Sequence, residues 1–222
     1  MKRKVLITTF ALLVITGIVI GLIFLFAGIK SKKEAHSYNR QGDVYFKQGL
    51  YNEAINVYKK ALEFEPSAYT YYRLGNAYYN IGAYEDAEFS HKKALSIEPN
   101  IAESYSHLGN IYSEEGRYDE AITMYKSALE IRPDSALLLN NLANAYMNKG
   151  LYEEAMAEID RALAIEPDLA IAHFTYGEIF QKIGNLEKAI NEFEKIKDDP
   201  IHGNEARRTI AEIKELIEES QL

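Results

Sequence analysis

The chain has 222 residues, of which 47% are hydrophobic and 26% are charged, a composition typical of a folded protein. The absence of Cys excludes disulfides, zinc knuckles and thiol catalysis. Residues 35–222 carry 19 Lys and Arg against 32 Asp and Glu, a net charge of −13. Such a surface repels a phosphate backbone, so DNA and RNA are not expected partners.

The first predicted element is an apolar segment, residues 5–29, which contains no charged side chain. It lies between a short basic tail (1–4) and a basic flank (30–34). As a helix it would be roughly 37 Å long, enough to cross a hydrocarbon layer of about 30 Å. A cleaved signal peptide is the alternative, but its apolar region is usually about 7 to 15 residues long. The sequence therefore predicts an uncleaved transmembrane helix.

Within this segment, Gly17 and Gly21 form a GxxxG spacing that would let two copies pair as a homodimer through the anchor. The alternative is that Gly is simply common in membrane helices. Three basic residues flank each end, so the charge bias discriminates little between the two orientations. Of the two, we expect the one that places the soluble domain on the extracytoplasmic side of the membrane.

Beyond the flank, the sequence repeats. The segment "NLANAYMNKGLYEEAMAEIDRALAIEP" (141–167) has copies such as "HLGNIYSEEGRYDEAITMYKSALEIRP" (107–133) and a weaker one from residue 175. One small residue marks each copy at intervals of 33, 34, 34 and 34: Gly42, Gly75, Gly109, Ala143 and Gly177. A period of this length predicts stacked supersecondary units.

Each unit is predicted to be a helical hairpin, because apolar residues recur at helical spacing on both sides of a central Gly. In the fourth unit, Leu139, Leu142 and Tyr146 share one face of the first helix. Gly150 is then expected to take the left-handed conformation that ends this helix. A proline follows the second helix of the first four units and stops it: Pro66, Pro99, Pro133 and Pro167.

This 34-residue pattern of small, Tyr, Ala, aromatic, Ala and Pro resembles the tetratricopeptide repeat. The resemblance implies an all-α solenoid with five repeats at 35–67, 68–101, 102–135, 136–169 and a divergent 170–203. Residues 204–222 place Ala206, Ile210, Ile213 and Ile217 on one stripe. We therefore expect a capping helix that covers the last repeat.

Several Asn residues occupy the first helix of the fourth repeat. At about 100° per residue, Asn140, Asn141, Asn144 and Asn148 are predicted to face away from the hairpin core. The resemblance implies that this side lines a concave surface, which in such proteins holds extended peptides or partner helices. Stacking would align Asn144 with Asn76 and Asn110, whose carboxamides can pair with a peptide main chain. The alternative is a solvated polar face without a ligand.

The repeat register predicts a peptide-binding groove with aromatic pockets on the same side. Its predicted residues are Phe46, Tyr69, Tyr72, Arg73, Asn76, Tyr79, His107, Asn110, Asn141, Asn144, Asn148 and Phe174. The carboxylate-clamp subtype is not expected, because its paired basic residues are largely replaced by neutral or acidic ones.

The strongest constellation for catalysis or metal binding is Glu103, Ser106, His107 and Glu114 on one helix, but no second His completes a site. We therefore expect no enzyme activity, metal or cofactor. The predicted function is that of a membrane-anchored scaffold or adaptor that binds a protein or peptide partner. Two alternatives stay open: a self-associating structural accessory, and a non-catalytic subunit of a membrane enzyme or secretion complex.

Overall fold

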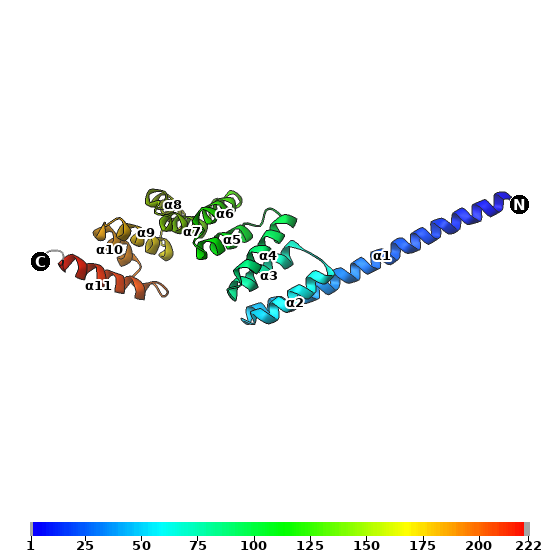
Figure 1. The fold of residues 1–222 in the computed structure, drawn as a ribbon, viewed down its shortest axis with the longest axis horizontal. Coiled ribbons are helices and arrows are strands. Elements are labelled where there is room, and N and C mark those ends of the chain that lie inside the picture. The colour runs from blue at the N-terminus through cyan, green and yellow to red at the C-terminus, as the bar shows by residue number, and fades with distance from the viewer. Residues whose placement is uncertain (1, 220–222) are drawn as a thin grey trace. The chain divides into compact units, whose positions relative to one another are not determined.

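The computed structural model describes the backbone of residues 2–219 and the side chains of residues 16–219. Over this part the protein is entirely α-helical (Figure 1). The helices are α1 (Lys2–Lys47), α2 (Tyr51–Phe64), α3 (Ala68–Asn80), α4 (Tyr84–Ile97), α5 (Ala102–Glu114), α6 (Tyr118–Ile131), α7 (Ala136–Asn148), α8 (Tyr152–Ile165), α9 (Ala170–Lys182), α10 (Leu186–Lys195) and α11 (Gly203–Glu219).

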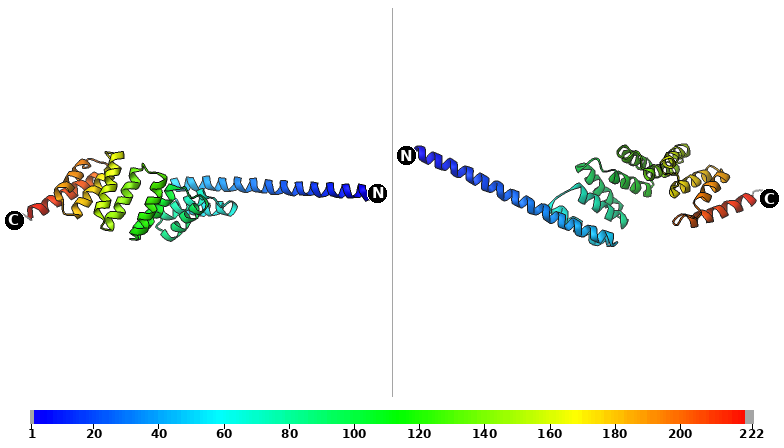
Figure 2. Two further views of the ribbon diagram at one scale, coloured as in Figure 1. Left: turned by 90° about the horizontal axis from the view of Figure 1, so that it is seen from above. Right: turned by 180° about the vertical axis from the view of Figure 1, so that it is seen from behind.

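Consecutive helices pack in pairs, α1 with α2, α3 with α4, and so on to α9 with α10, while α11 packs on α10. Figure 2 shows the two helices of a pair lying side by side. The chain forms two compact units, Met1–Ile97 (unit 1, with α1 to α4) and Glu98–Leu222 (unit 2, with α5 to α11). The predicted all-α array of helical hairpins is confirmed.

The turn inside each hairpin follows the expected glycine geometry. Gly150 has φ +82°, and its N–H donates to the carbonyl of Met147 at 2.9 Å. The N–H of Leu151 donates to the carbonyl of Tyr146, also at 2.9 Å. These bonds satisfy the last carbonyls of α7, and only a residue without a Cβ adopts this backbone without strain.

Side-chain caps and prolines set other helix ends. Ser67 Oγ accepts a hydrogen bond from the N–H of Thr70 at 3.2 Å and so caps the N-terminus of α3. Ser135 caps α7 in the same way through the N–H of Leu138 at 3.4 Å. At the other end, α8 stops at Ile165, two residues before Pro167.

The small residue of each first helix makes room for a bulky side chain of the second. A Cβ on Gly109 would stand 2.6 Å from Cε1 of Tyr125. In the fourth repeat, Ala143 replaces Gly, and the facing residue is Ile159 rather than a ring; both are fully buried. Close approach of the two helices therefore depends on matched sizes at this position.

The C-terminal helix α11 packs as the apolar stripe predicted. Its Ala206, Ile210 and Ile213 are buried in one cluster with Phe180 and Phe193 of the last hairpin. This packing removes the last repeat's apolar face from solvent, which terminal repeats of a solenoid require.

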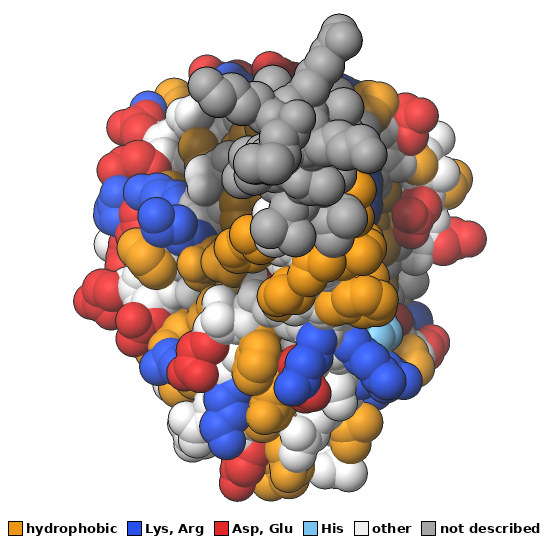
Figure 3. Space-filling view, turned by 90° about the vertical axis from the view of Figure 1, so that its right-hand side faces the viewer, with side chains coloured by type: hydrophobic (Ala, Val, Ile, Leu, Met, Phe, Trp, Pro, Cys, Tyr) orange, Lys and Arg blue, Asp and Glu red, His pale blue; other side chains and the backbone are white. Residues whose placement is uncertain are grey.

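Helix α1 runs without interruption from Lys2 through residues 30–34 to Lys47, so it includes both the predicted membrane segment and the first helix of the first repeat. Within the described part of the chain, no helix has enough apolar length to cross a membrane. Residues 5–15 of the predicted span lie outside the described side chains. The described remainder is exposed: Ile18, Phe24 and Ile29 are 58%, 73% and 55% accessible. Figure 3 shows hydrophobic side chains exposed at this end of the protein.

Candidate functional site

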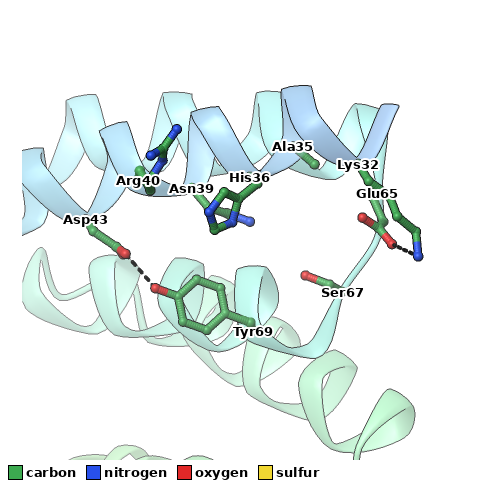
Figure 4. A pocket seen from close by; sticks show the side chains of 9 residues that line it. All are labelled: Lys32, Ala35, His36, Asn39, Arg40, Asp43, Glu65, Ser67 and Tyr69. Carbon is green, nitrogen blue, oxygen red and sulfur yellow. Dashed lines mark hydrogen bonds and ion pairs between the residues drawn. The ribbon is translucent and has the colours of Figure 1, made fainter. Parts of the chain in front are cut away.

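In unit 1, the predicted groove residues Tyr69 and Arg73 of α3 meet on Asp43 of α1. The Tyr69 hydroxyl donates to Asp43 Oδ2 at 2.5 Å (Figure 4). Arg73 Nε lies 3.0 Å from Asp43 Oδ1, which also accepts a hydrogen bond from the Tyr58 hydroxyl at 2.8 Å. One carboxylate thus joins three side chains from α2 and α3.

The Arg73 guanidinium makes cation–π contacts in addition to its ion pair with Asp43. Its Cζ lies 5.4 Å from the ring centroid of Tyr69 and 6.0 Å from that of Phe46. Its Nε also donates to the Tyr69 hydroxyl at 3.2 Å. Burial raises the pKa of the Tyr69 hydroxyl, and the bond to Asp43 raises it further. We call Asp43, Tyr58, Tyr69 and Arg73 the Asp43 cluster.

Beside this cluster lies a pocket of about 350 Å³ between α1 and α3. Figure 4 shows His36 and Asn39 extending from α1 on the side of Tyr69 and Ser67. At its edge, Lys32 Nζ and Glu65 Oε1 form an ion pair at 3.6 Å. The lining residues are Lys32, Ala35, His36, Asn39, Arg40, Asp43, Glu65, Ser67 and Tyr69.

Of the other predicted groove residues of unit 1, Asn76 is buried, whereas Tyr72 and Tyr79 are partly exposed. Asn76 is only 6% exposed, and its Oδ1 has no hydrogen-bond partner within the described chain. The Tyr72 ring packs edge-on against His91 at 6.0 Å, and the Tyr79 ring lies 5.6 Å from that of Tyr84. Both Tyr rings therefore contact the second helix of their own hairpin.

In unit 2, the Asn residues occupy different environments. Asn110 Oδ1 accepts a hydrogen bond from the Tyr125 hydroxyl at 2.7 Å. Asn141 and Asn144 are partly exposed, and Asn148 is exposed at the end of α7. Asn140 is 1% exposed, so it does not lie on a solvent-exposed surface. The reason is that α7 packs against α9 and α6 as well as α8, which buries more than one of its sides.

Two further predicted residues of unit 2 are half-buried. Burial lowers the pKa of the His107 imidazole on α5. Phe174 of α9 packs edge-on against Phe193 at 5.4 Å and lies 5.9 Å from the His202 ring. Phe174 therefore belongs to the packing of the last repeat.

The same face of α9 carries Glu178, at the register of Asn110 and Asn144. Burial raises the pKa of this carboxyl, Lys182 lowers it, and Glu205 of α11 raises it. Asp43, Asn76, Asn110, Asn144 and Glu178 thus fill equivalent positions, divided between unit 1 and unit 2.

The proposed membrane-helix contact, Gly17 and Gly21, lies in the described part of α1. Among the residues whose side chains the structure describes, nothing stands within 4 Å of a Cβ built on either residue, so that side of α1 is open toward them.

The four residues considered for catalysis or metal binding lie on α5. Glu103 is engaged in an ion pair with Arg132, the residue that follows α6. Within the described residues, no group of three or more His, Cys, Asp or Glu side chains is placed to hold a metal ion.

Sequence reasoning missed Tyr58 and Thr70 as parts of the site. Asn39, which lines the pocket, donates through Nδ2 to Thr70 Oγ1 at 2.9 Å and so links α1 to α3. A signal for Tyr58 was present, because Tyr58 and Tyr125 share one repeat position and each donates to the residue after the small one, Asp43 or Asn110.

Three solved structures illustrate what the chain is similar to. A crystal structure of MamA is 26% identical, with a TM-score of 0.65 over 77% of this chain and 96% of that one. The protein TTC0263, a thermophilic TPR protein of Thermus thermophilus, is 21% identical, with a TM-score of 0.63 over 81% and 98%. The Pseudomonas aeruginosa pilF protein is 18% identical, with a TM-score of 0.68 over 83% and 90%. The latter two likenesses show the fold alone.

A comparison with curated proteins found no match. A family model does match: the cilia and flagella-associated protein 70 C-terminal domain, a tetratricopeptide domain, over residues 26–213. The match covers α1 from residue 26, all of α2 to α10, and most of α11. Tetratricopeptide scaffolds bind protein partners and are generally non-catalytic. The chain therefore belongs to the tetratricopeptide family described by the C-terminal domain of cilia and flagella-associated protein 70.

Proposed function

We propose that this protein is a membrane-anchored scaffold that holds an extended segment or a helix of a partner protein against the first helices of its hairpins. The observation that carries the proposal is the unsatisfied carboxamide of Asn76. Its Oδ1 is buried without a partner in the described chain, and an unpaired buried acceptor costs about 1–3 kcal/mol. A main-chain N–H of a bound segment would remove that cost.

The partly exposed Asn141 and Asn144 support the same mode in unit 2. Their carboxamides offer both a donor and an acceptor without a net charge. Such groups hold a peptide backbone with little dependence on its side chains, so sequence preference would come from neighbouring groups.

Anchoring is supported by the apolar character of residues 5–29 and by the exposure of the described part of that segment. Side chains such as Ile23 (61% exposed) and Phe26 (67% exposed) are largely accessible to solvent in the single chain. A hydrocarbon environment would remove this surface from water. We place the hairpins on the extracytoplasmic side.

The groove is tested in native membranes by crosslinking followed by mass spectrometry. We expect the triple variant N76A/N110A/N144A to lose captured partners while its helical circular dichroism is unchanged. The matched control is N52A/N56A/N191A, which removes three exposed Asn residues of α2 and α10. Equal partner recovery from the two variants and the natural protein would show that these Asn residues do not hold the partner.

The orientation is tested with a single Cys in place of Leu222, which is feasible because the chain has no other Cys. We expect a membrane-impermeant maleimide to label this Cys from outside intact cells. Labelling only after lysis would reverse the proposed orientation, and recovery of the protein in the soluble fraction would end the anchoring proposal.

A second function, self-association through the anchor, is favoured by the open side of α1 at Gly17 and Gly21. Light scattering of the full chain in detergent would then give a dimer, and G17L/G21L a monomer. A monomer in both cases excludes this function and leaves the scaffold proposal intact.

A further inference from the structure

The pocket between α1 and α3 contains acidic and basic side chains that are not equally satisfied. Asp43 accepts hydrogen bonds from two hydroxyls and pairs with Arg73. Glu65 pairs with Lys32. Both carboxylates that line the pocket are thus compensated inside unit 1.

Two of the basic residues at the pocket, in contrast, are not paired with any described residue. His36 and Arg40 are exposed and have no hydrogen bond or ion pair in the part of the chain that the structure describes. With Lys32 they are spaced by four residues on α1, so the three lie along one side of the helix. The uncompensated charge at the pocket is therefore positive, although the protein as a whole is acidic.

From this imbalance we infer that the pocket binds an acidic side chain, Glu or Asp, of a partner's peptide segment. The carboxylate would pair with Arg40 and His36, while the segment continues along α3 toward Asn76. The inference rests on the proposed function, because it names the kind of segment that the same helix face selects. It differs from a clamp for chain ends, since an internal acidic side chain is sufficient.

A lipid head group is the competing source of negative charge, because α1 carries the proposed anchor. Arg40 lies eleven residues beyond Ile29, about 16 Å along the helix. The head-group layer on one side of a bilayer is only about 5 to 8 Å thick. Lys32 is within reach of such a layer, but Arg40 is beyond it, which favours a peptide as the occupant.

The Asp43 cluster limits how strongly the pocket prefers an acidic segment. The ion pair with Asp43 neutralises Arg73. Without this pair, Arg73 would be a second unpaired cation beside Arg40. In the next three repeats the equivalent residue is Asn. Replacing Asp43 by Asn would release Arg73 and should strengthen the binding of an acidic segment.

The test uses the full chain in neutral detergent and two decapeptides of Gly and Ser, acetylated and amidated at their ends, that contain either three Glu or three Gln. Isothermal titration calorimetry should show the Glu peptide binding at least tenfold more tightly, with an affinity that falls as salt rises. R40Q should weaken the Glu peptide about tenfold and H36Q to a smaller extent. K47Q removes an exposed charge of α1 outside the pocket and should have no effect.

D43N should bind the Glu peptide more tightly than the natural protein, a gain that misfolding cannot produce. Equal affinity for the two peptides, or a natural affinity in R40Q, overturns the inference. So does a result in which R40Q loses binding to phosphatidylserine nanodiscs while the Glu peptide does not bind at all. Partner capture that depends on Asn76 but ignores Arg40 would leave the scaffold function standing and remove only this inference.

Discussion

The ring of Tyr125 occupies the space into which a side chain on Gly109 would extend. A Cβ on Gly109 would stand 2.6 Å from Cε1 and 2.7 Å from Cδ1 of that ring. The same fit recurs between Gly177 and Phe193. This contact sets how closely the two helices of a hairpin approach.

We expect G109A to lower the free energy of unfolding by about 1–2 kcal/mol, because overpacking outweighs the better helix propensity of Ala. Urea unfolding followed by circular dichroism measures this change. The double variant G109A/Y125I has the Ala and Ile combination found at Ala143 and Ile159. In a double-mutant cycle, it should be about 1 kcal/mol more stable than the sum of the two single changes predicts. Additive effects would show that the ring does not restrict residue 109.

The Asp43 cluster should stabilise unit 1 locally. D43A leaves the buried Tyr58 hydroxyl without an acceptor, and we expect a loss of about 2–3 kcal/mol. D43N keeps an acceptor, as Asn110 does for Tyr125, and should lose about half as much. Hydrogen exchange of α2 and α3 is the measurement, with α7 to α10 as the internal reference. Equal exchange in the two variants would show that the acceptor is unimportant.

His107 should make stability depend on pH. Its folded pKa is lowered below the ordinary 6.5 by burial, so in the window below 6.5 the unfolded chain binds the proton and the folded one does not. Stability is therefore full above that window and falls as pH decreases through it, by at most about 1.4 kcal/mol per pH unit. H107Q should flatten the slope between pH 7.5 and 5.0 in urea unfolding. H36Q, at an exposed His, is the control, and an unchanged slope in H107Q would contradict the prediction.

Ionisation of Glu178 should lower the stability of the folded protein, whereas ionisation of an ion-paired carboxylate raises it. Its folded pKa is raised above the ordinary 4.5, with burial as the largest cause. The folded chain holds the proton more strongly, so stability falls as pH rises from 4.5 through the folded pKa. E178Q should therefore stabilise the protein at pH 7 but not at pH 4, as measured by thermal unfolding. E218Q, at an exposed residue of α11, should change neither value.

Much of the fold was predictable because each copy of the repeat has the same kinds of residue at its turn and at its helix ends. The turn glycines, the prolines and the stripe of α11 act through local backbone rules, which depend on few distant contacts. The burial of Asn76 and Asn140 was not predictable from one helical wheel. A wheel shows only the side that faces the hairpin partner, whereas α3 and α7 also pack against helices of a neighbouring hairpin.

The Asp43 cluster was missed for a related reason. Tyr58 lies on the second helix of its repeat, and Tyr69 and Arg73 lie on the next repeat, so their meeting depends on how hairpins stack. The groove prediction identified Tyr69 and Arg73 separately, without the carboxylate that joins them. Comparing equivalent positions across copies for hydrogen-bonding pairs, and not only for apolar ones, would have indicated Tyr58.

The continuity of α1 has a mechanical consequence. One uninterrupted ladder of main-chain hydrogen bonds links the apolar residues before Lys30 to the first helix of the first repeat. No glycine or proline interrupts residues 30–41, so there is no joint between the two parts. Rotation of the apolar part about its axis would therefore turn the pocket with it. Each residue inserted after Ile29 would change the azimuth of the pocket by roughly 100°.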